Sequence, residues 1–331
     1  MSLRHRLSSR WWIGPALRLA VSAALILLVC RRIDLHGLAG QFAAQSPVWV
    51  IAAAIVTLAQ IGLAALRWQQ ILLGLGIRAP TETVLSVSYT ASFFNAWLLG
   101  TMGGDVARAV LAPPGARGRA VIVHSVLLDR IVTFAGIGYV ILPITLLGTG
   151  PLAHSLPLMV ALIAALLPLA LLPFLVPLVR FIGQRMPFFW LAAGLGDSWS
   201  ELQRARHRLA ATQAIAVLSA LALALTPWCL ARAQSLDVSF ADFLMLMPPV
   251  VLLTGLPISV GGWGVREGAM IAALATVGVG ASTATLLSVQ IGALAAVLSI
   301  PAGALWLWRF LAARRPLDAP RRVAPAPPRS S

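Results

Sequence analysis

The chain of 331 residues has no lysine, few charged residues and only two cysteines. Charged residues make up 11% of it and hydrophobic residues 59%, which excludes a soluble enzyme with a few membrane anchors. Cys30 and Cys229 both lie at the ends of apolar runs, so neither a disulfide framework nor a cysteine metal site is expected. The sequence also has no Walker-type phosphate loop, so we expect no direct use of ATP and no cofactor.

Arginine supplies all 25 basic residues, and with ten acidic residues the net charge is +15. In a soluble chain this excess would indicate nucleic acid. Here the arginines flank apolar runs, a pattern typical of cytoplasmic loops and of contact with anionic headgroups. We therefore expect membrane lipids, above all anionic ones, as partners, and no nucleic acid.

Apolar runs of membrane-spanning length divide the chain and predict an all-α polytopic protein of the inner (cytoplasmic) membrane. The six predicted full spans are, in residue numbers, about 11–30, 47–66, 119–147, 156–179, 209–230 and 284–308. Residues 1–315 are expected to form the integral membrane domain, and 316–331 a disordered tail, with both termini cytoplasmic. Arg180–Arg208 mixes arginines with aromatic residues, which indicates a cytoplasmic segment at the membrane interface.

Two stretches of similar sequence interrupt this pattern. The first pseudo-repeat, 83–112, holds Gly103, Gly104, Asp105 and Arg108, and the second, 240–279, holds Gly261, Gly262, Arg266 and Glu267. An arginine follows the glycine pair at the same distance in both, because 261 − 103 and 266 − 108 both equal 158. Charges at membrane depth are costly, so these residues are candidates for function.

The first stretch is too short after its glycine pair to cross the bilayer again, and the second stretch mirrors it. Residues 104–112 would form a helix of roughly 14 Å, about half the hydrocarbon thickness. We therefore expect two re-entrant hairpins that turn at the glycines, and, because three full spans separate them, an inverted repeat. Eight to ten full spans are the alternative, which the charge distribution fits equally well.

The expected hairpins are suited to bind an anion. A helix that begins directly after a glycine pair directs free N–H groups and its positive dipole end into the turn. Asp105 suits the N-cap and an i,i+3 contact with Arg108, and Glu267 suits an arginine of the opposite hairpin. The expected substrate-binding residues are Gly103, Gly104, Asp105, Arg108, Gly261, Gly262, Arg266 and Glu267.

Three further residues are expected to support this site: Asn95, Asp129 and Arg130. Asn95 continues a polar helix face with Ser88 and Ser92, which also suits hydrogen bonds between helices. Asp129 and Arg130 are adjacent in a predicted span and cannot face each other, so we expect them to pair with the hairpin charges. A purely structural ion pair, close packing at the glycines and snorkelling of the hairpin arginines are the alternatives.

The two glycine stretches resemble the flippase-like family, which is the membrane region of lysylphosphatidylglycerol synthases and its stand-alone relatives. The resemblance lies in a Gly-Gly-Asp-x-x-Arg turn after Asn95, in Leu-Pro-Ile-Ser-x-Gly-Gly-x-Gly-x-Arg-Glu at 256–267, in Arg67-Trp68 and in Asp129-Arg130. Leu98-Leu99 stand where the family usually has a proline. The resemblance covers nearly all of the chain and implies transfer of a lipid or lipid-linked headgroup between leaflets. It does not imply lipid aminoacylation, because only sixteen residues, 316–331, follow the predicted membrane domain.

Two other functions are considered beside lipid transfer. His124 and Asp129 have the His-x4-Asp spacing of glycerolipid acyltransferases, and a membrane enzyme of acyl or glycosyl transfer would need such a base. On a continuous helix, however, five residues separate the two side chains by about 140°. A non-transporting scaffold for lipid-biosynthesis enzymes is the third possibility. We expect lipid transfer and no enzymatic activity.

Overall fold

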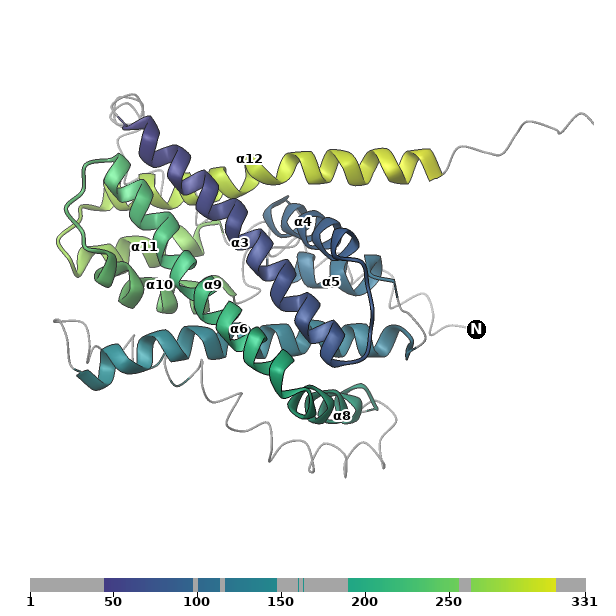
Figure 1. Ribbon diagram of the computed structural model, residues 1–331. Coiled ribbons are helices and arrows are strands. Elements are labelled where there is room, and N and C mark those ends of the chain that lie inside the picture. The colour runs from purple at the N-terminus through teal and green to yellow at the C-terminus, as the bar shows by residue number, and fades with distance from the viewer. Residues whose placement is uncertain are drawn as a thin grey trace, which may run out of the picture.

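In the computed structural model, five stretches of the chain are described, together with residues 160 and 163. The stretches are residues 45–97, 101–113, 117–147, 190–255 and 263–313. They form nine helices and no strand (Figure 1): α3 (Pro47–Gly74), α4 (Thr81–Trp97), α5 (Thr101–Leu111), α6 (Arg119–Leu147), α8 (Trp190–Arg204), α9 (Arg206–Ala233), α10 (Phe240–Gly255), α11 (Val265–Ala275) and α12 (Ala281–Ala313).

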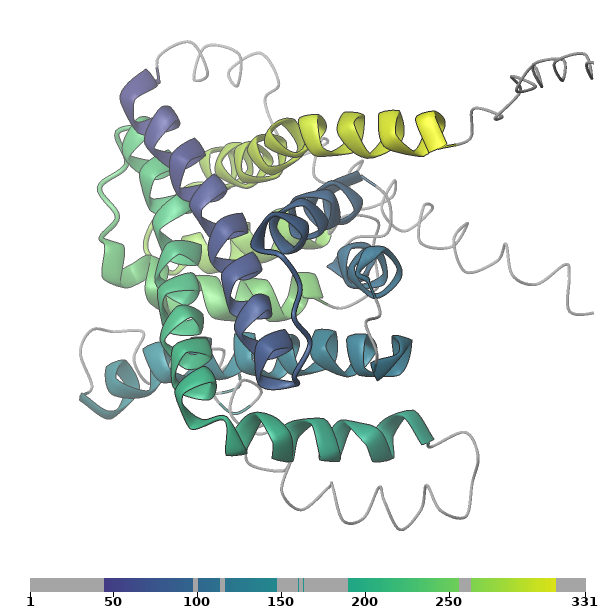
Figure 2. The same cartoon turned by 45° about the vertical axis from the view of Figure 1, so that its right-hand side comes forward.

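Four of the described helices are long and apolar enough to cross a membrane, namely α3, α6, α9 and α12. They confirm the predicted spans at 47–66, 119–147, 209–230 and 284–308. The other two predicted spans, 11–30 and 156–179, lie outside the described residues, as does the predicted tail 316–331. The helices α3 and α9 run side by side (Figures 1 and 2).

Small residues let the long helices approach one another closely. The buried face of α9 carries alanine at every fourth position, Ala216, Ala220 and Ala224. Gly136 of α6 lies against Ala216, and a methyl group there would come within 2.6 Å of the Ala216 backbone. Membrane helices gain stability from such close packing because lipid provides no hydrophobic drive toward association.

The prediction that the second span ends at Arg67-Trp68 is wrong. The helix α3 continues to Gly74, and Arg67 and Trp68 are both buried within it. An arginine ends an apolar helix only if it must reach water. Arg67 instead has a buried carboxylate partner on α6, so the helix runs on past it.

Two pairs of shorter helices correspond to the two glycine stretches. The 17-residue α4 packs on the 11-residue α5, and the 16-residue α10 packs on the 11-residue α11. The helix α12 contacts both pairs: its first half packs on α11 and its second half on α4 (Figure 1). One long helix thus connects the two pairs.

The first glycine pair is placed differently from the prediction. The helix α5 begins at Thr101, so Gly103 and Gly104 lie inside its first turn, and Asp105 is not at its N-cap. Gly104 packs against α4, where an added methyl group would lie 2.6 Å from the Asn95 amide and 2.7 Å from the Ala91 carbonyl oxygen. Gly104 therefore allows close packing of α5 on α4, which is the alternative expected for the glycines. Gly261 and Gly262 lie outside the described residues.

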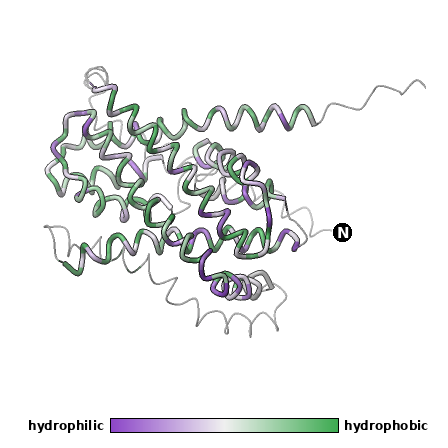
Figure 3. Tube along the Cα trace, in the orientation of Figure 1, coloured by the Kyte–Doolittle hydropathy of each residue, from purple (hydrophilic) through white to green (hydrophobic). Residues whose placement is uncertain are grey.

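The segment predicted at the membrane interface contains the amphipathic helix α8. Its apolar face buries Trp199 and Leu202 against Ile71 and Leu128. Hydrophilic residues gather at the junction of α8 with α9 (Figure 3). The amphipathic character of α8 is typical of an interfacial helix, while its position relative to a membrane stays a prediction.

Candidate functional site

A single buried carboxylate holds two arginines at the centre of the described helices. Asp129 of α6 accepts hydrogen bonds from Arg67 Nε at 2.7 Å and from Arg108 Nη1 at 2.8 Å. Arg67 Nη2 also donates to the second carboxylate oxygen at 3.2 Å. Arg67 and Asp129 are only 4% and 3% exposed. Two guanidinium groups share one carboxylate, so this trio carries a net positive charge.

The same three helices are joined by Trp68, the neighbour of Arg67 on α3. Its indole N–H donates to Ser125 Oγ of α6 at 3.0 Å. The guanidinium carbon of Arg108 lies 5.4 Å from the centre of the Trp68 ring, within the range of a cation–π contact. The ring therefore supports Arg108 where its charge is only partly balanced by Asp129.

A second ion pair joins α6 to α5 through Arg130, the residue after Asp129. Arg130 Nε donates to Asp105 Oδ2 at 2.6 Å. The prediction that Asp129 and Arg130 pair with charges of the first stretch is thus confirmed, since their partners include Arg108 and Asp105. The expected contact between Asp105 and Arg108 is replaced by these two bridges to α6. Arg108 and Asp105 each bind a charged side chain of α6 instead, so the weaker i,i+3 pair between them does not form.

Asn95 caps α5 from the neighbouring helix. The first four N–H groups of a helix have no partner inside it, and Gly104 is the fourth residue of α5. Its N–H donates to Asn95 Oδ1 at 2.6 Å. Asn95 therefore supports the site as predicted, but through the backbone of α5.

In the second stretch, Glu267 forms an ion pair with the adjacent Arg266. Glu267 is 3% exposed and its Oε1 accepts a hydrogen bond from Arg266 Nη2 at 2.8 Å. Ser288 of α12 accepts from Arg266 Nε and donates to Glu267, both at 3.2 Å. The expected pairing of Glu267 with an arginine of the opposite stretch is therefore wrong. The serine on α12 completes the local network, so Glu267 has no need of a distant partner.

The turn before α11 depends on a glycine beyond the predicted pair. Gly264 has φ of 86° and donates its N–H to Glu267, which stands at the third position of the helix. Only glycine adopts this conformation without strain. Arg266 lies over the Trp263 ring at 4.6 Å, and Gly292 of α12 lies directly against its guanidinium, where a side chain would collide with it.

The arginines of both stretches line one cavity of about 350 Å³. Arg108 comes from α5 and Arg266 from α11, with Trp263 beside it. The polar part of the remaining wall consists of Thr57 and Gln60 on α3 and of Ser88, Ser92 and Asn95 on α4. The sequence therefore predicted two arginines that the structure brings to one cavity, although α5 and α11 present them differently.

Two buried atoms of this cavity have no hydrogen-bond partner among the described residues: Arg108 Nε and Ser88 Oγ. Buried polar groups are nearly always paired, so these two donors, on α5 and α4, lack the acceptors that such groups normally have. An oxyanion suits the cavity because it accepts several hydrogen bonds and balances the charge of Arg108. Within the described stretches, no group of acidic, histidine or cysteine residues could hold a metal ion.

Sequence reasoning did not identify Arg67, Thr57 or Gln60 as site residues. Arg67 was taken as the end of a span, although a charge followed by further apolar turns, Ile71–Leu73, could have marked it as buried. Thr57 and Gln60 are isolated polar residues in an apolar run, and their i,i+3 spacing places them on one face of α3.

His124 and Asp129, which have the acyltransferase spacing, bind different partners. His124 is buried on α6, and its Nδ1 lies 3.1 Å from Ser198 Oγ of α8. Both carboxylate oxygens of Asp129 accept hydrogen bonds from arginines. A carboxylate occupied in this way is not available to orient a histidine as general base.

Residues 16–303 match the family model described as lysylphosphatidylglycerol synthase TM region. No curated protein matches the chain. The match includes every residue of the cavity, both ion-paired arginines of α5 and α6, and the four long apolar helices up to residue 303.

Proposed function

The chain belongs to the lysylphosphatidylglycerol synthase TM region family, and we propose that it moves an anionic lipid headgroup between the leaflets of its membrane. It is a multi-pass membrane protein with four long apolar helices in its described part. The observation that carries the proposal is that Arg108 and Arg266 line one cavity, beside the surplus positive charge of Arg67, Asp129 and Arg108.

Charge balance supports an anionic ligand. Arg67 and Arg108 share Asp129, which leaves one positive charge, whereas Arg266 and Glu267 form a neutral pair. An unbalanced charge in a low-dielectric region is costly unless a counter-charge arrives. One negative charge on a phosphodiester headgroup neutralises the cavity and supplies acceptors for Arg108 and Ser88.

The acyl chains need a path beside the headgroup. A second cavity of about 390 Å³ lies between α3, α4 and α12, and Ile61 lines both it and the arginine cavity. Its wall is mostly apolar, with Leu58, Leu85 and Ala302 among its residues. A headgroup between the arginines and chains along this apolar cavity would keep each part of the lipid in a matching environment.

The proposed architecture places α4–α5 and α10–α11 as re-entrant pairs that enter from opposite faces. Helices of 11 residues reach roughly 16 Å, too short to cross the hydrocarbon layer alone. An inverted repeat of this kind holds a site near the midplane and opens it alternately to either side. Eight to ten full spans remain the alternative architecture.

Cysteine labelling tests this topology. In a chain with Cys30 and Cys229 replaced, single cysteines at His154 and His207 should react from outside and from the cytoplasm, respectively. The reason is that 148–155 lacks the arginines that surround His207. Labelling of both from the same side would contradict the inverted repeat.

Transport is tested with purified protein in phosphatidylcholine vesicles that contain a trace of fluorescent phosphatidylglycerol. Exposure of the fluorophore to a membrane-impermeant quencher reports movement between leaflets, and lipid extraction afterwards detects any new product. We expect movement without a product. A product would favour the enzyme, and neither movement nor product would favour the scaffold.

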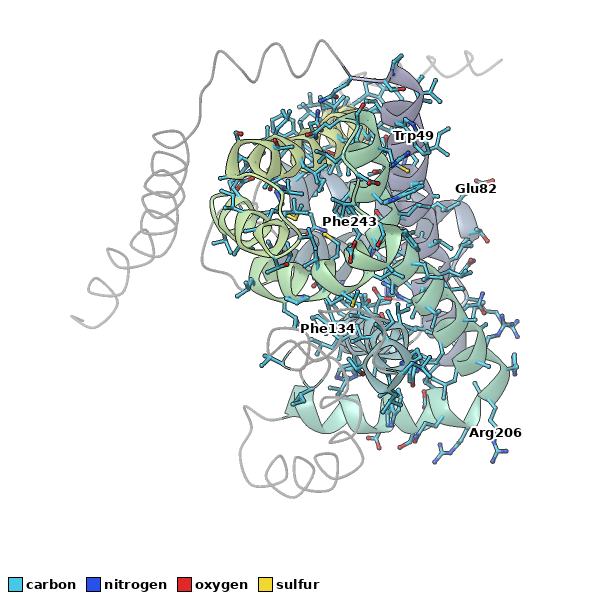
Figure 4. The ribbon with its side chains drawn as sticks, turned by 90° about the vertical axis from the view of Figure 1, so that its left-hand side faces the viewer. Trp49, Glu82, Phe134, Arg206 and Phe243 are labelled. Atoms are coloured by element: carbon cyan, nitrogen blue, oxygen red, sulfur yellow. The ribbon has the colours of Figure 1, made fainter. Side chains whose placement is uncertain are left out.

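Lysine substitutions test the site in the same assay. Arg108→Lys and Arg266→Lys keep the charge but lose the planar fork that binds a phosphate through two hydrogen bonds. Each should slow transport by about tenfold, and the double variant should be hardly worse if both arms hold one ligand. Arg206→Lys, on the exposed start of α9, is the matched control (Figure 4). Normal transport by the double variant would place the headgroup elsewhere.

A further inference from the structure

A polar cavity of about 490 Å³ lies where the start of α4 meets the last turns of α12. Glu82, Thr83 and Ser86 line it from α4, and Trp306 and Arg309 line it from α12. It shares no lining residue with the cavity of Arg108 and Arg266, but it shares Ser86, Thr90, Leu305 and Arg309 with the apolar cavity proposed for the acyl chains. The proposed transport function gives no role to its two charged residues, Glu82 and Arg309.

This cavity holds a cation and an anion that are not paired with each other. Arg309 Nη1 donates to Ser86 Oγ at 3.2 Å, and Ser86 stands one helical turn after Glu82. Glu82 has no ion-pair or hydrogen-bond partner within the described stretches, and Figure 4 shows it at the edge of the helices. Two opposite charges one turn apart on a common wall match a ligand that carries both a negative and a positive group.

The aromatic residues of the cavity place it at the level of lipid headgroups. Trp306 lies edge-on to Phe94 at 5.1 Å between ring centres and is stacked on Phe310 at 5.5 Å. Trp308, two residues further on, is 67% exposed. Tryptophan and arginine at the end of a long apolar helix are typical of the membrane interface. Aromatic faces also attract ammonium groups.

From these contacts we propose that the Glu82–Arg309 cavity binds the headgroup of a zwitterionic aminophospholipid, with the phosphate on Arg309 and the ammonium on Glu82. In an ethanolamine headgroup two carbons separate these groups, which fits charges that stand apart on one wall. The site recognises a lipid of the bilayer and is separate from the headgroup site proposed for transport.

The surroundings favour a lipid over a soluble phosphoamine. Leu305 in the cavity wall is 43% exposed, and it also lines the apolar cavity between α3, α4 and α12. An apolar cavity that adjoins the polar one provides a surface for acyl chains. A soluble compound would leave this surface unused.

Lipid binding to the full chain in detergent, followed by native mass spectrometry, tests the proposal. The probes are phosphatidylethanolamine, phosphatidylglycerol and soluble glycerophosphoethanolamine. Glu82→Gln should weaken binding of phosphatidylethanolamine about fivefold, as expected for one partly exposed charge pair, and leave binding of phosphatidylglycerol unchanged. Arg309→Gln should weaken binding of phosphatidylethanolamine by a similar factor.

The control variant is Arg206→Gln, an exposed arginine outside the cavity, which should leave both affinities unchanged. Both site residues are exposed, so their substitution is not expected to unfold the chain. Binding of phosphatidylethanolamine that is unchanged in Glu82→Gln or in Arg309→Gln would overturn the proposal. Competition by glycerophosphoethanolamine as strong as that by the lipid would overturn the lipid as ligand. Because the readout is binding, a failure here leaves the transport assay unaffected.

Discussion

The two glycine stretches share a sequence pattern but use their arginines differently. Arg108 is the eighth residue of α5 and reaches across to α6, where it shares Asp129 with Arg67. Arg266 is the second residue of α11 and is held by its neighbour Glu267 and by Ser288. The first arrangement joins three helices and has surplus charge, whereas the second is local and neutral. Equal spacing from a glycine pair therefore does not make two arginines structurally equivalent.

Removal of the shared carboxylate should have the largest effect. Asp129→Ala leaves two buried guanidinium groups without their partner, at a cost of roughly 3–5 kcal/mol in unfolding free energy. Folded yield in membranes, measured by size-exclusion chromatography of a fluorescent fusion, should fall sharply. Normal yield with loss of transport alone would instead place Asp129 in the substrate path.

The two partners of Asp129 should separate stability from transport. Arg67→Gln removes two buried hydrogen bonds and should lower the unfolding free energy by roughly 1–3 kcal/mol. Arg108→Gln leaves Asp129 paired with Arg67, so it should affect stability less and transport more. Thermal unfolding and vesicle transport of both variants check this. Equal loss of stability in both would mean that the trio serves the bundle alone.

Loss of the acid in the second stretch should be milder than loss of Asp129. Glu267→Gln weakens the bonds to Arg266 and to the Gly264 N–H, but Ser288 still contacts Arg266, so we expect a loss of roughly 1–2 kcal/mol. Thermal unfolding beside Asp129→Ala and a Ser288→Ala control measures the difference. A loss as large as that of Asp129→Ala would mean that the two stretches do not differ in how they balance charge.

Glycine substitutions should give the smallest effects, with opposite signs in the two stretches. Gly104→Ala places a methyl group against Asn95 and Ala91, and we expect a loss of roughly 1–2 kcal/mol. Gly268→Ala in α11 meets nothing within 4 Å and should stabilise the chain by about 0.5–1 kcal/mol through helix propensity. Thermal unfolding of the two variants measures both changes in stability. A stabilising Gly104→Ala would contradict close packing of α4 on α5.

The sequence predicted the long helices because apolar runs of more than 18 residues have few other structures available in a membrane protein. It also predicted Asp129 and Arg130 as partners of the first stretch, since buried charges need partners. The start of α5 was missed because Asn95, on a different helix, caps Gly104. The full length of α3 was missed because the partner of Arg67 lies 62 residues away. Both errors come from contacts between helices, which a local pattern does not contain.

Two ion pairs join α5 to α6: Arg108 with Asp129, and Asp105 with Arg130. The two residues of α5 stand about one helical turn apart. Two ion pairs fix the angle between the helices, whereas a single ion pair allows one helix to turn about it. If a phosphate draws Arg108 away from Asp129, Asp129 stays paired with Arg67. The helix α5 then stays joined to α6 by the ion pair of Asp105 and Arg130. Ligand and carboxylate thus compete for one guanidinium, and the bound headgroup would weaken the attachment of α5 to α6 while the Asn95 cap still holds α5 to α4.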